Sequence, residues 1–300
     1  MKTIRILAAI TVLFAIGFNS AIADADPFDR ERSIVYMETH GVGLLVDIFT
    51  PKENANGLAI VDVVSGAWHS DAGKLRDHER AQMFDIYCTR GFTVFGIRPG
   101  SVTKFTGSEM LSHVKQGIRY AKSRADDFNF DPDRMGIVGA SAGGHLALLA
   151  TVHAEDGNPD SKDSLKKLDT HLKAVAVFFP PTDFLEWGGQ RLDFSNGQIS
   201  ASIGRLLFTG GVDGQSEDRL MAMAKRISPL HNIPTSTPPF LLIHGDADPL
   251  VPLNQSRKFV EAVIKNGGAA DLIVKEGGAH PWPTIDEEVV VMADWFEKQL

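Results

Sequence analysis

The sequence predicts an α/β fold: a doubly wound, mostly parallel sheet of about eight strands, with an antiparallel N-terminal edge and helices on both faces. Short β-branched and apolar runs alternate with longer runs of helical spacing along most of the 300 residues. Strands separated by helices of about ten or more residues pair in parallel through right-handed crossovers. Hydrophobic residues make up 43% of the chain, and no repeat or low-complexity linker divides it, so we expect one domain.

The first predicted elements form the antiparallel edge. SIVYMETH at 33–40 and GLLVDIF at 43–49 are expected to be two strands, joined by a tight turn at residues 41–43. The next run, LAIVDVVS at 58–65, has the continuous β-branched composition of a strand that is buried on both faces.

Helices and strands then alternate to the C-terminus. We expect helices at 74–90, 108–125, 142 to about 154, 254–267 and about 285–298, and strands at 92–97, 135–140, 174–179, 240–245 and 270–276. Residues 185–235 interrupt this alternation with Gly-rich, polar sequence. Two interpretations of this insertion stay open: a partial lid above the sheet, or a surface excursion without a role.

Residues 1–23 have the composition of a secretory signal peptide. A start with two basic residues precedes an almost wholly apolar run at 6–18, and the small residues 21–23 suit a cleavage site. The apolar run is shorter than the roughly 20 residues that span a bilayer, which favours a cleaved signal peptide. An uncleaved membrane anchor is the alternative. We expect a secreted or periplasmic protein of residues 24–300, without stable membrane insertion after cleavage.

Charge and composition exclude several classes of function. The formal net charge of −8 becomes −10 without residues 1–23, which carry two basic and no acidic side chains. An acidic chain without a basic run does not suit nucleic-acid phosphates, so no nucleic-acid partner is expected. Cys88 is the only cysteine, which excludes an intramolecular disulfide and predicts a small buried side chain. No H-E-x-x-H or similar spacing occurs, so we expect neither a metal nor a cofactor.

The sequence RMGIVGASAGGHLALL at 134–149 surrounds one serine with glycine and alanine. Its G-x-S-x-G motif follows a predicted buried strand and opens a predicted helix, which is the context of a nucleophile on a sharp, strained turn. Small neighbours let backbone segments pass closely, and the helix N-terminus favours negative charge that develops at Ser141. The alternative is a packing turn with a bystander serine.

A nucleophilic serine needs a histidine base and an acid that orients the base, and on this kind of turn the chain order is Ser, acid, His. Asp246 and Asp248 follow the predicted strand at 240–245, and His280 follows the one at 270–276. His280 is the only histidine after the acid at the end of a strand. We favour Asp248 as the acid, because Asp246 is expected to accept N–H bonds within its own turn.

The oxyanion of an ester reaction needs two backbone N–H donors. One is expected from Ala142, directly after the serine, and one from VSGAWHS at 64–70, where Gly66 and Ala67 have small side chains. Residues 64–70 also fit a glycine turn that leads into a helix.

These blocks resemble the α/β-hydrolase superfamily. The segments that carry the resemblance are DPDRMGIVGASAGGHLALL, LLIHGDADPLVP and DLIVKEGGAHPWP. They are most similar to secreted esterases of the acetyl-xylan and feruloyl type (BD-FAE-like), which are related to the hormone-sensitive-lipase group. The resemblance runs from about Leu58 to the C-terminus, excluding 185–235. It implies an α/β-hydrolase fold and the roles already assigned to Ser141, Asp248, His280, Gly66, Ala67 and Ala142.

The sequence departs from the family pattern at two places. Val64-Ser65-Gly66-Ala67 stands where the family has His-Gly-Gly-Gly, and residues 98–101 replace a Tyr-Arg-Leu type of loop. The first departure bears directly on the geometry of the oxyanion donors.

The expected activity is two-step acyl transfer, without a cofactor, on short-chain, polysaccharide or aryl esters. Trp68, Trp282 and Asp183 are candidate substrate-binding residues, since aromatic rings near a site can stack on sugar or phenolic rings. Packing is the alternative for the tryptophans, and capping of a helix is the alternative for Asp183. Two other functions stay open: a serine peptidase like the prolyl oligopeptidases, and a non-catalytic binding protein on a hydrolase fold. The peptidase ranks second because about 35 residues separate the signal from the third strand, too few for a gating domain.

Overall fold

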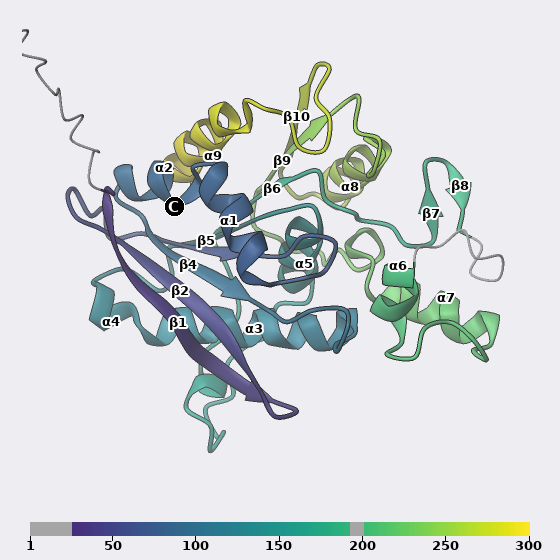
Figure 1. Ribbon diagram of the computed structural model, residues 1–300, viewed down its shortest axis with the longest axis horizontal. Helices are drawn as coiled ribbons and strands as arrows, with labels where there is room; N and C mark the ends of the chain where they lie inside the picture. Colours follow the sequence, from purple (N-terminus) through teal and green to yellow (C-terminus); the bar gives the residue numbers. More distant parts are fainter. Residues whose placement is uncertain (1–25, 193–200) are drawn as a thin grey trace, which may run out of the picture.

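Figure 1 shows the computed structural model, which describes residues 26–192 and 201–300. The main sheet has eight strands in the order β1-β2-β4-β3-β5-β6-β9-β10. Strand β2 is antiparallel to both of its neighbours, and the remaining pairs are parallel. The strands are β1 (Phe28–Thr39), β2 (Val42–Pro51), β3 (Ala59–Val63), β4 (Thr93–Arg98), β5 (Met135–Ala140), β6 (Ala174–Phe178), β9 (Phe240–Gly245) and β10 (Ala270–Lys275). The predicted mostly parallel sheet with an antiparallel N-terminal edge is confirmed.

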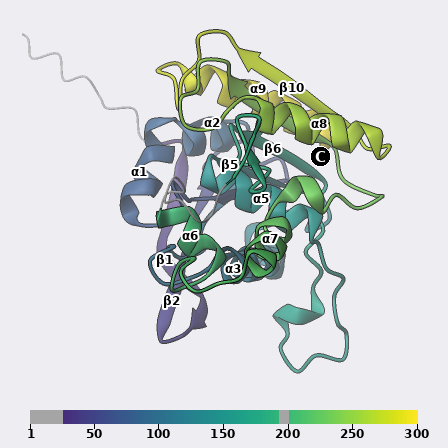
Figure 2. The same ribbon diagram turned by 90° about the vertical axis from the view of Figure 1, so that its right-hand side faces the viewer.

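Helices cover both faces of this sheet, and each face has its own hydrophobic cluster beneath the helices. One face carries α1 (Ala72–Arg80), α2 (Met83–Thr89) and α9 (Ile285–Gln299). The other carries α3 (Gly107–Ser123), the short α4 (Ala125–Phe128), α5 (Ala142–Val152) and α8 (Asn254–Lys265). Helix α8 packs against β10 and α9 packs against α2 and β6, and Figure 2 shows α8, α9 and β10 on the same side of the molecule. Cys88 in α2 is buried, as predicted.

The helix predicted over 74–90 is in fact two helices, α1 and α2. Gln82 lies between them with a φ of 54°, a left-handed conformation that a continuous helix does not contain. The start of α1 is fixed by Asp71, whose side chain accepts the N–H groups of Gly73 and Lys74. No glycine or proline stands at the break, so the sequence carried no signal for it. Strand β1 likewise begins five residues before the predicted position 33.

The insertion at 185–235 leaves the sheet between β6 and β9 (Figure 1). It contains the hairpin β7 (Glu186–Trp187) and β8 (Gln190–Arg191), the helices α6 (Ala201–Leu207) and α7 (Glu217–Arg226), and the 3-10 turn η2 (Pro229–His231). A second 3-10 turn, η1 (Leu165–Lys167), precedes β6. Part of the insertion and the predicted signal peptide at 1–23 lie outside the described residues.

No helix within residues 26–192 and 201–300 has the length and apolar character to cross a bilayer. No three His, Cys, Asp or Glu side chains there converge as metal ligands would.

Candidate active site

Ser141 occupies the turn between β5 and α5 with a φ of 53°, which is unusual for a residue other than glycine and typical of functional sites. Gly139 and Gly143 make this turn sterically possible. A Cβ on Gly139 would lie 2.5 Å from the carbonyl carbon of Gly143, and a Cβ on Gly143 would lie 2.2 Å from the carbonyl oxygen of Val63. The glycines are therefore needed for close backbone contact, as the sequence pattern indicated.

Ser141, His280 and Asp248 form one continuous hydrogen-bonded chain. His280 Nε2 is 2.9 Å from Ser141 Oγ, and His280 Nδ1 is 2.6 Å from Asp248 Oδ2. Because the carboxylate can only accept, Nδ1 carries a proton and Nε2 of the neutral ring can accept the serine proton. The three residues follow β5, β10 and β9, whose carboxyl ends meet at one edge of the sheet.

The Asp248 carboxylate is fully buried and densely hydrogen-bonded. Its Oδ1 accepts the N–H groups of Leu250 and Val251 at 2.8 and 2.9 Å, and His244 Nε2 lies 3.3 Å from its Oδ2. Burial raises the pKa of Asp248, but the hydrogen bonds from His244, His280 and the two amides outweigh it and hold that pKa well below its usual range. Asp248 is therefore an anion at neutral pH.

Asp246 has a different partner from the one predicted. Its Oδ1 accepts the N–H of Gly277 at 2.7 Å, in the neighbouring loop, and not an amide of its own turn. The N–H of Ala247 also donates to the carbonyl of Gly278 at 3.0 Å. These contacts join the loop that carries Asp248 to the loop that carries His280.

The turn after β3 corrects one predicted oxyanion donor. The N–H of Gly66 donates to His69 O, and the N–H of His69 donates to Gly66 O, both at 2.9 Å. Gly66 is therefore not free to donate to a substrate. Ala67 and Trp68 lie between Gly66 and His69 and have φ values of 47° and 58°. These are the values of a type I′ turn, whose central N–H groups point outward.

Two predicted donors keep free N–H groups. Neither Ala67 nor Ala142 finds an acceptor for its N–H among the residues that the structure describes. Ala67 lines the same cavity as Ser141, and Ala142 is the first residue of α5, where a helix leaves its N–H groups unpaired.

Trp68 and Trp282 line the cavity, but their indole N–H groups are already bonded. Trp68 Nε1 donates to His145 Nδ1 at 3.0 Å, and Trp282 Nε1 donates to Glu288 Oε2 at 2.6 Å. Burial lowers the pKa of His145 to about 4, so that ring is neutral and accepts the indole proton. The two tryptophans are 7% and 5% exposed and therefore offer a substrate only part of their ring surface.

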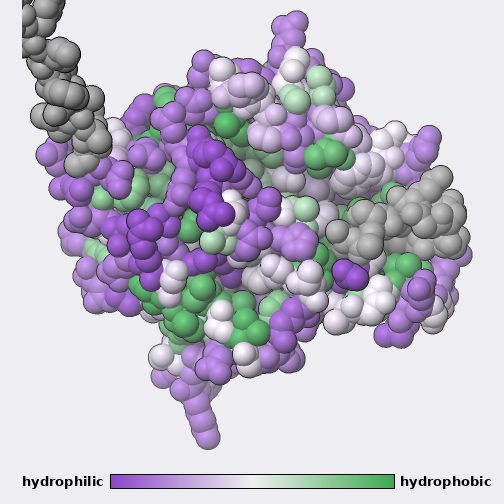
Figure 3. Space-filling view, viewed as in Figure 1, coloured by the Kyte–Doolittle hydropathy of each residue, from purple (hydrophilic) through white to green (hydrophobic). Residues whose placement is uncertain are grey.

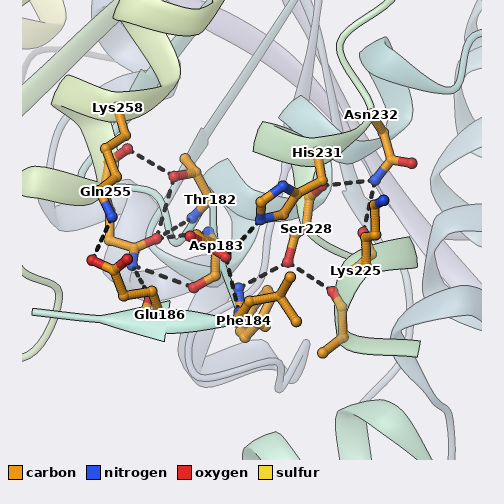
Figure 4. A network of polar contacts seen from close by, with 12 residues as sticks. Thr182, Asp183, Phe184, Glu186, Lys225, Ser228, His231, Asn232, Gln255 and Lys258 are labelled. Carbon is orange, nitrogen blue, oxygen red and sulfur yellow. Dashed lines mark hydrogen bonds and ion pairs between the residues drawn. The ribbon is translucent and has the colours of Figure 1, made fainter. Parts of the chain in front are cut away.

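Asp183, a predicted substrate-binding residue, does not line the cavity. It also caps no α-helix: its Oδ1 accepts the N–H of Leu185 and lies 2.9 Å from His231 Nε2 (Figure 4). Beside it, the N–H of Phe184 donates to Ser228 Oγ at 2.8 Å. Asp183 therefore belongs to a polar network that joins the beginning of the insertion to its end.

The cavity that contains Ser141 and His280 has a volume of about 850 Å³. The insertion contributes Trp187, Leu192 and Ile203 to its wall. Helix α1 contributes another part of the wall. Figure 1 shows α1 and α6 well apart, with α5 between them, so the cavity extends across this end of the molecule. The cavity is thus large enough for an ester with substituents on both sides of its carbonyl group.

Three residues near the site were not singled out by the sequence pattern. The ring of Phe179 packs on His280 with 4.3 Å between ring centroids. His244, in strand β9, lies next to the side chain of Asp248. Ser65 lines the cavity, and its Oγ has no partner among the described residues. The fold brings Phe179 and His244 to the site, and no sequence motif marks them. Ser65 did carry a signal in the sequence, because it replaces a glycine of the family motif.

The sequence model of the BD-FAE family matches residues 46–263, more than half of the chain. The chain belongs to the BD-FAE family. This BD-FAE assignment places it among the α/β-hydrolase esterases, in agreement with the resemblance of its motifs. The match includes Ser141 and Asp248 and ends before His280.

Curated relatives of this BD-FAE protein come from Mycobacterium tuberculosis and plants. Esterase LipQ of M. tuberculosis is 26% identical over 236 residues, which cover 77% of this chain and 52% of LipQ. Probable carboxylic ester hydrolase LipM of the same organism is 29% identical over 202 residues, covering 67% of this chain and 44% of LipM. The chain spans about half the length of the curated relatives it matches.

Solved structures resemble the BD-FAE chain over nearly its whole length. A truncated carbohydrate esterase from gut microbiota superposes with a TM-score of 0.75 and 26% identity, covering 91% of this chain and 97% of that one. A propionate-bound esterase of Thermogutta terrifontis superposes with a TM-score of 0.66 and 26% identity, covering 88% and 92%. The fold is therefore the α/β-hydrolase fold that the motifs implied.

Proposed function

We propose that this protein is a serine esterase that hydrolyses carboxylic esters through Ser141, His280 and Asp248. The observation that carries the proposal is the hydrogen-bonded chain from Ser141 Oγ through both His280 nitrogens to the buried Asp248 carboxylate. Family membership and the names of the relatives support the same reaction class.

The reaction begins when His280 Nε2 takes the proton of Ser141 as Oγ attacks the ester carbonyl carbon. The His280 imidazolium that forms is stabilised by Asp248, whose low pKa keeps the carboxylate charged. Negative charge on the former carbonyl oxygen is stabilised by the N–H groups of Ala67 and Ala142, with the positive dipole end of α5 behind them.

Collapse of the tetrahedral intermediate releases the alcohol, which takes its proton from His280. The acyl group then remains on Ser141 as an ester. A water molecule, deprotonated by His280, attacks this acyl-enzyme and releases the carboxylic acid, which restores the serine hydroxyl. Every proton in both steps passes through Nε2 of one imidazole.

We propose short acyl groups on carbohydrate or aryl alcohols as the substrates. The structural relative named a carbohydrate esterase and the one with bound propionate support this class. Ring surfaces of Trp68, Trp187 and Trp282 in the cavity wall are suited to flat or sugar rings. We also propose that the insertion, in its described parts 185–192 and 201–235, acts as a partial lid, because Trp187, Leu192 and Ile203 contribute to that wall.

We further propose that the protein is exported, on the composition of residues 1–23 alone. Acetylated polysaccharide outside the cytoplasm is a substrate consistent with such a location.

The experiment is hydrolysis of p-nitrophenyl acetate by the purified protein, compared with p-nitrophenyl esters of longer acyl chains, acetylated xylan and an aminoacyl p-nitroanilide. We expect acetate to be cleaved faster than long acyl chains or the anilide, and Ser141→Ala to abolish the reaction. Faster cleavage of the anilide would instead support a peptidase. A folded protein that releases no product from any ester would refute the proposal.

A further inference from the structure

Strand β3 carries one acidic residue on a strand that is buried throughout. Asp62 is fully buried among apolar residues of Ala59–Val63. A carboxylate in such a place is costly unless it is paired. His78 of α1 supplies the pair, with Nδ1 2.6 Å from Asp62 Oδ2, whereas Asp62 Oδ1 has no partner within the described chain. A buried ion pair often adds little to the stability of a fold. The position of His78 therefore bears on whether the pair has a role in binding.

His78 lines the same cavity as Ser141 and His280. Its Nε2 has no hydrogen-bond partner in the described part of the chain and is not fully enclosed. Because Nδ1 bonds Asp62 and His78 is part of the cavity wall, Nε2 is the ring nitrogen that remains for a ligand. Burial lowers the pKa of His78, but the charge and hydrogen bond of Asp62, together with Asp77, raise it more than burial and Lys74 lower it. The imidazolium form presents an N–H donor with a positive charge to the cavity.

Lys74 lies one turn before His78 on the same face of α1 and also lines the cavity. Its side chain crosses the turn that carries Ala67: a Cβ on Gly66 would lie 2.7 Å from Lys74 Cδ and 3.4 Å from Lys74 Nζ. Nζ lies 3.2 Å from Asp77 Oδ2, which occupies one of its three donors. The ammonium group is thus next to the turn that faces the reacting carbonyl.

Positive charge exceeds negative charge on this part of the wall. Helix α1 lines it with Lys74, His78 and Arg80, and two carboxylates face these cations. Asp77 bonds Lys74 and Arg80, and Asp62 pairs with His78. Figure 3 shows a mostly hydrophilic surface over α1 and α2. This part of the wall therefore keeps one net positive charge, in a chain of net charge −8.

We propose that Lys74 and His78 form a subsite for a carboxylate carried by the ester substrate, with Asp62 holding the His78 ring. The inference rests on the proposed function, because the carboxylate belongs to the ester that Ser141 attacks. Charged N–H donors bind carboxylates through short, strong hydrogen bonds, and attraction between charges is greater in a partly enclosed cavity than at the open surface. The preferred substrates are therefore acidic esters, such as acylated uronic acids or acylated aromatic acids.

Two matched substrate pairs test this subsite. One pair is 4-acetoxybenzoate and 4-acetoxybenzamide, which differ in charge on the alcohol side. The other is p-nitrophenyl hemisuccinate and p-nitrophenyl butyrate, which differ on the acyl side. The readout is the ratio of kcat/KM for the charged ester to that for the neutral one. We expect a ratio of about ten or more in at least one pair, mainly through a lower KM.

Three variants decide the origin of that ratio. His78→Gln and Lys74→Gln each remove one cation, and we expect the ratio to fall toward one in both. Lys265→Gln removes an exposed cation from α8, outside the cavity lining, and is expected to keep the wild-type ratio. Thermal unfolding checks that His78→Gln folds, and the half-exposed Lys74 provides an independent test.

The outcomes separate the two proposals. If the wild type hydrolyses neutral esters without preferring the charged member of either pair, or if the preference survives both variants, the subsite is refuted and the esterase proposal stands. If the wild type hydrolyses no ester, the esterase proposal fails and the subsite fails with it.

Discussion

The Oδ1 atom of Asp246 accepts the backbone N–H of Gly277 at 2.7 Å. This bond links the end of β9 to the end of β10. The two loops that it joins carry Asp248 and His280, so the bond fixes the distance between the acid and the base. Asp246 is thus a positioning residue, and its effect on the reaction passes through the loops.

Removal of this link is expected to slow the reaction. Asp246→Ala should lower kcat by about tenfold, the order of effect produced by small misplacement of catalytic groups. Asp246→Asn keeps an oxygen that accepts the Gly277 N–H and should restore most of the activity. Steady-state kinetics on p-nitrophenyl acetate provide the measurement. Equal loss in both variants would show that the charge of Asp246, and not the link, is what matters.

Asp248→Asn tests the role of the carboxylate on His280. The amide can donate to Nδ1, which favours the ring tautomer with the proton on Nε2, where it cannot accept the serine proton. We expect kcat to fall by about 10³–10⁴-fold with little change in KM. A loss below about tenfold would indicate that another acid, such as Asp246, orients the base.

The low pKa of Asp248 also predicts how stability depends on pH. The folded protein holds this carboxylate at a pKa below the ordinary value of about 3.9, so the folded state binds fewer protons there than the unfolded state. The stabilisation is present above about pH 4 and is lost as the pH falls further. Urea unfolding of the wild type and Asp248→Asn at pH 7 and pH 3 should show a larger difference in unfolding free energy at pH 7. A difference that grows toward pH 3 would contradict this sign.

The turn at Ser141 should tolerate no side chain at Gly143. A Cβ there would lie 2.2 Å from the backbone oxygen of Val63, which cannot move aside as a flexible side chain can. Gly143→Ala should therefore cost about 1–3 kcal/mol of stability or more and remove most of the activity. Gly210→Ala is the matched control, because a Cβ at Gly210 meets no atom within 4 Å. Near-wild-type stability of Gly143→Ala would refute this account of the turn.

Much of the fold and the arrangement of the site could be predicted from local sequence. The strand before Ser141, the small residues around it and the acid and base after two later strands are all local patterns. Parallel pairing brings the ends of such strands to one edge, so Ser141, Asp248 and His280 meet although 139 residues separate the first from the last.

Local sequence did not predict the features that contacts between distant or backbone groups decide. The helix break at Gln82 lies at a residue with a φ of 54° and has no glycine or proline beside it. The N–H of Gly66 is used within its own turn by His69, which small side chains cannot reveal. Asp183 is fixed by His231, 48 residues later in the chain. The buried Asp62 did offer a signal, since an acid in an apolar strand requires a partner.

Covalent labelling tests most directly whether Ser141 is a nucleophile activated by His280. The protein is treated with a fluorophosphonate and examined by intact-mass and peptide mass spectrometry. We expect one adduct per chain, on Ser141, formed more slowly in His280→Ala and absent in Ser141→Ala. A folded protein that remains unlabelled, or an adduct on another residue that persists in Ser141→Ala, would contradict it.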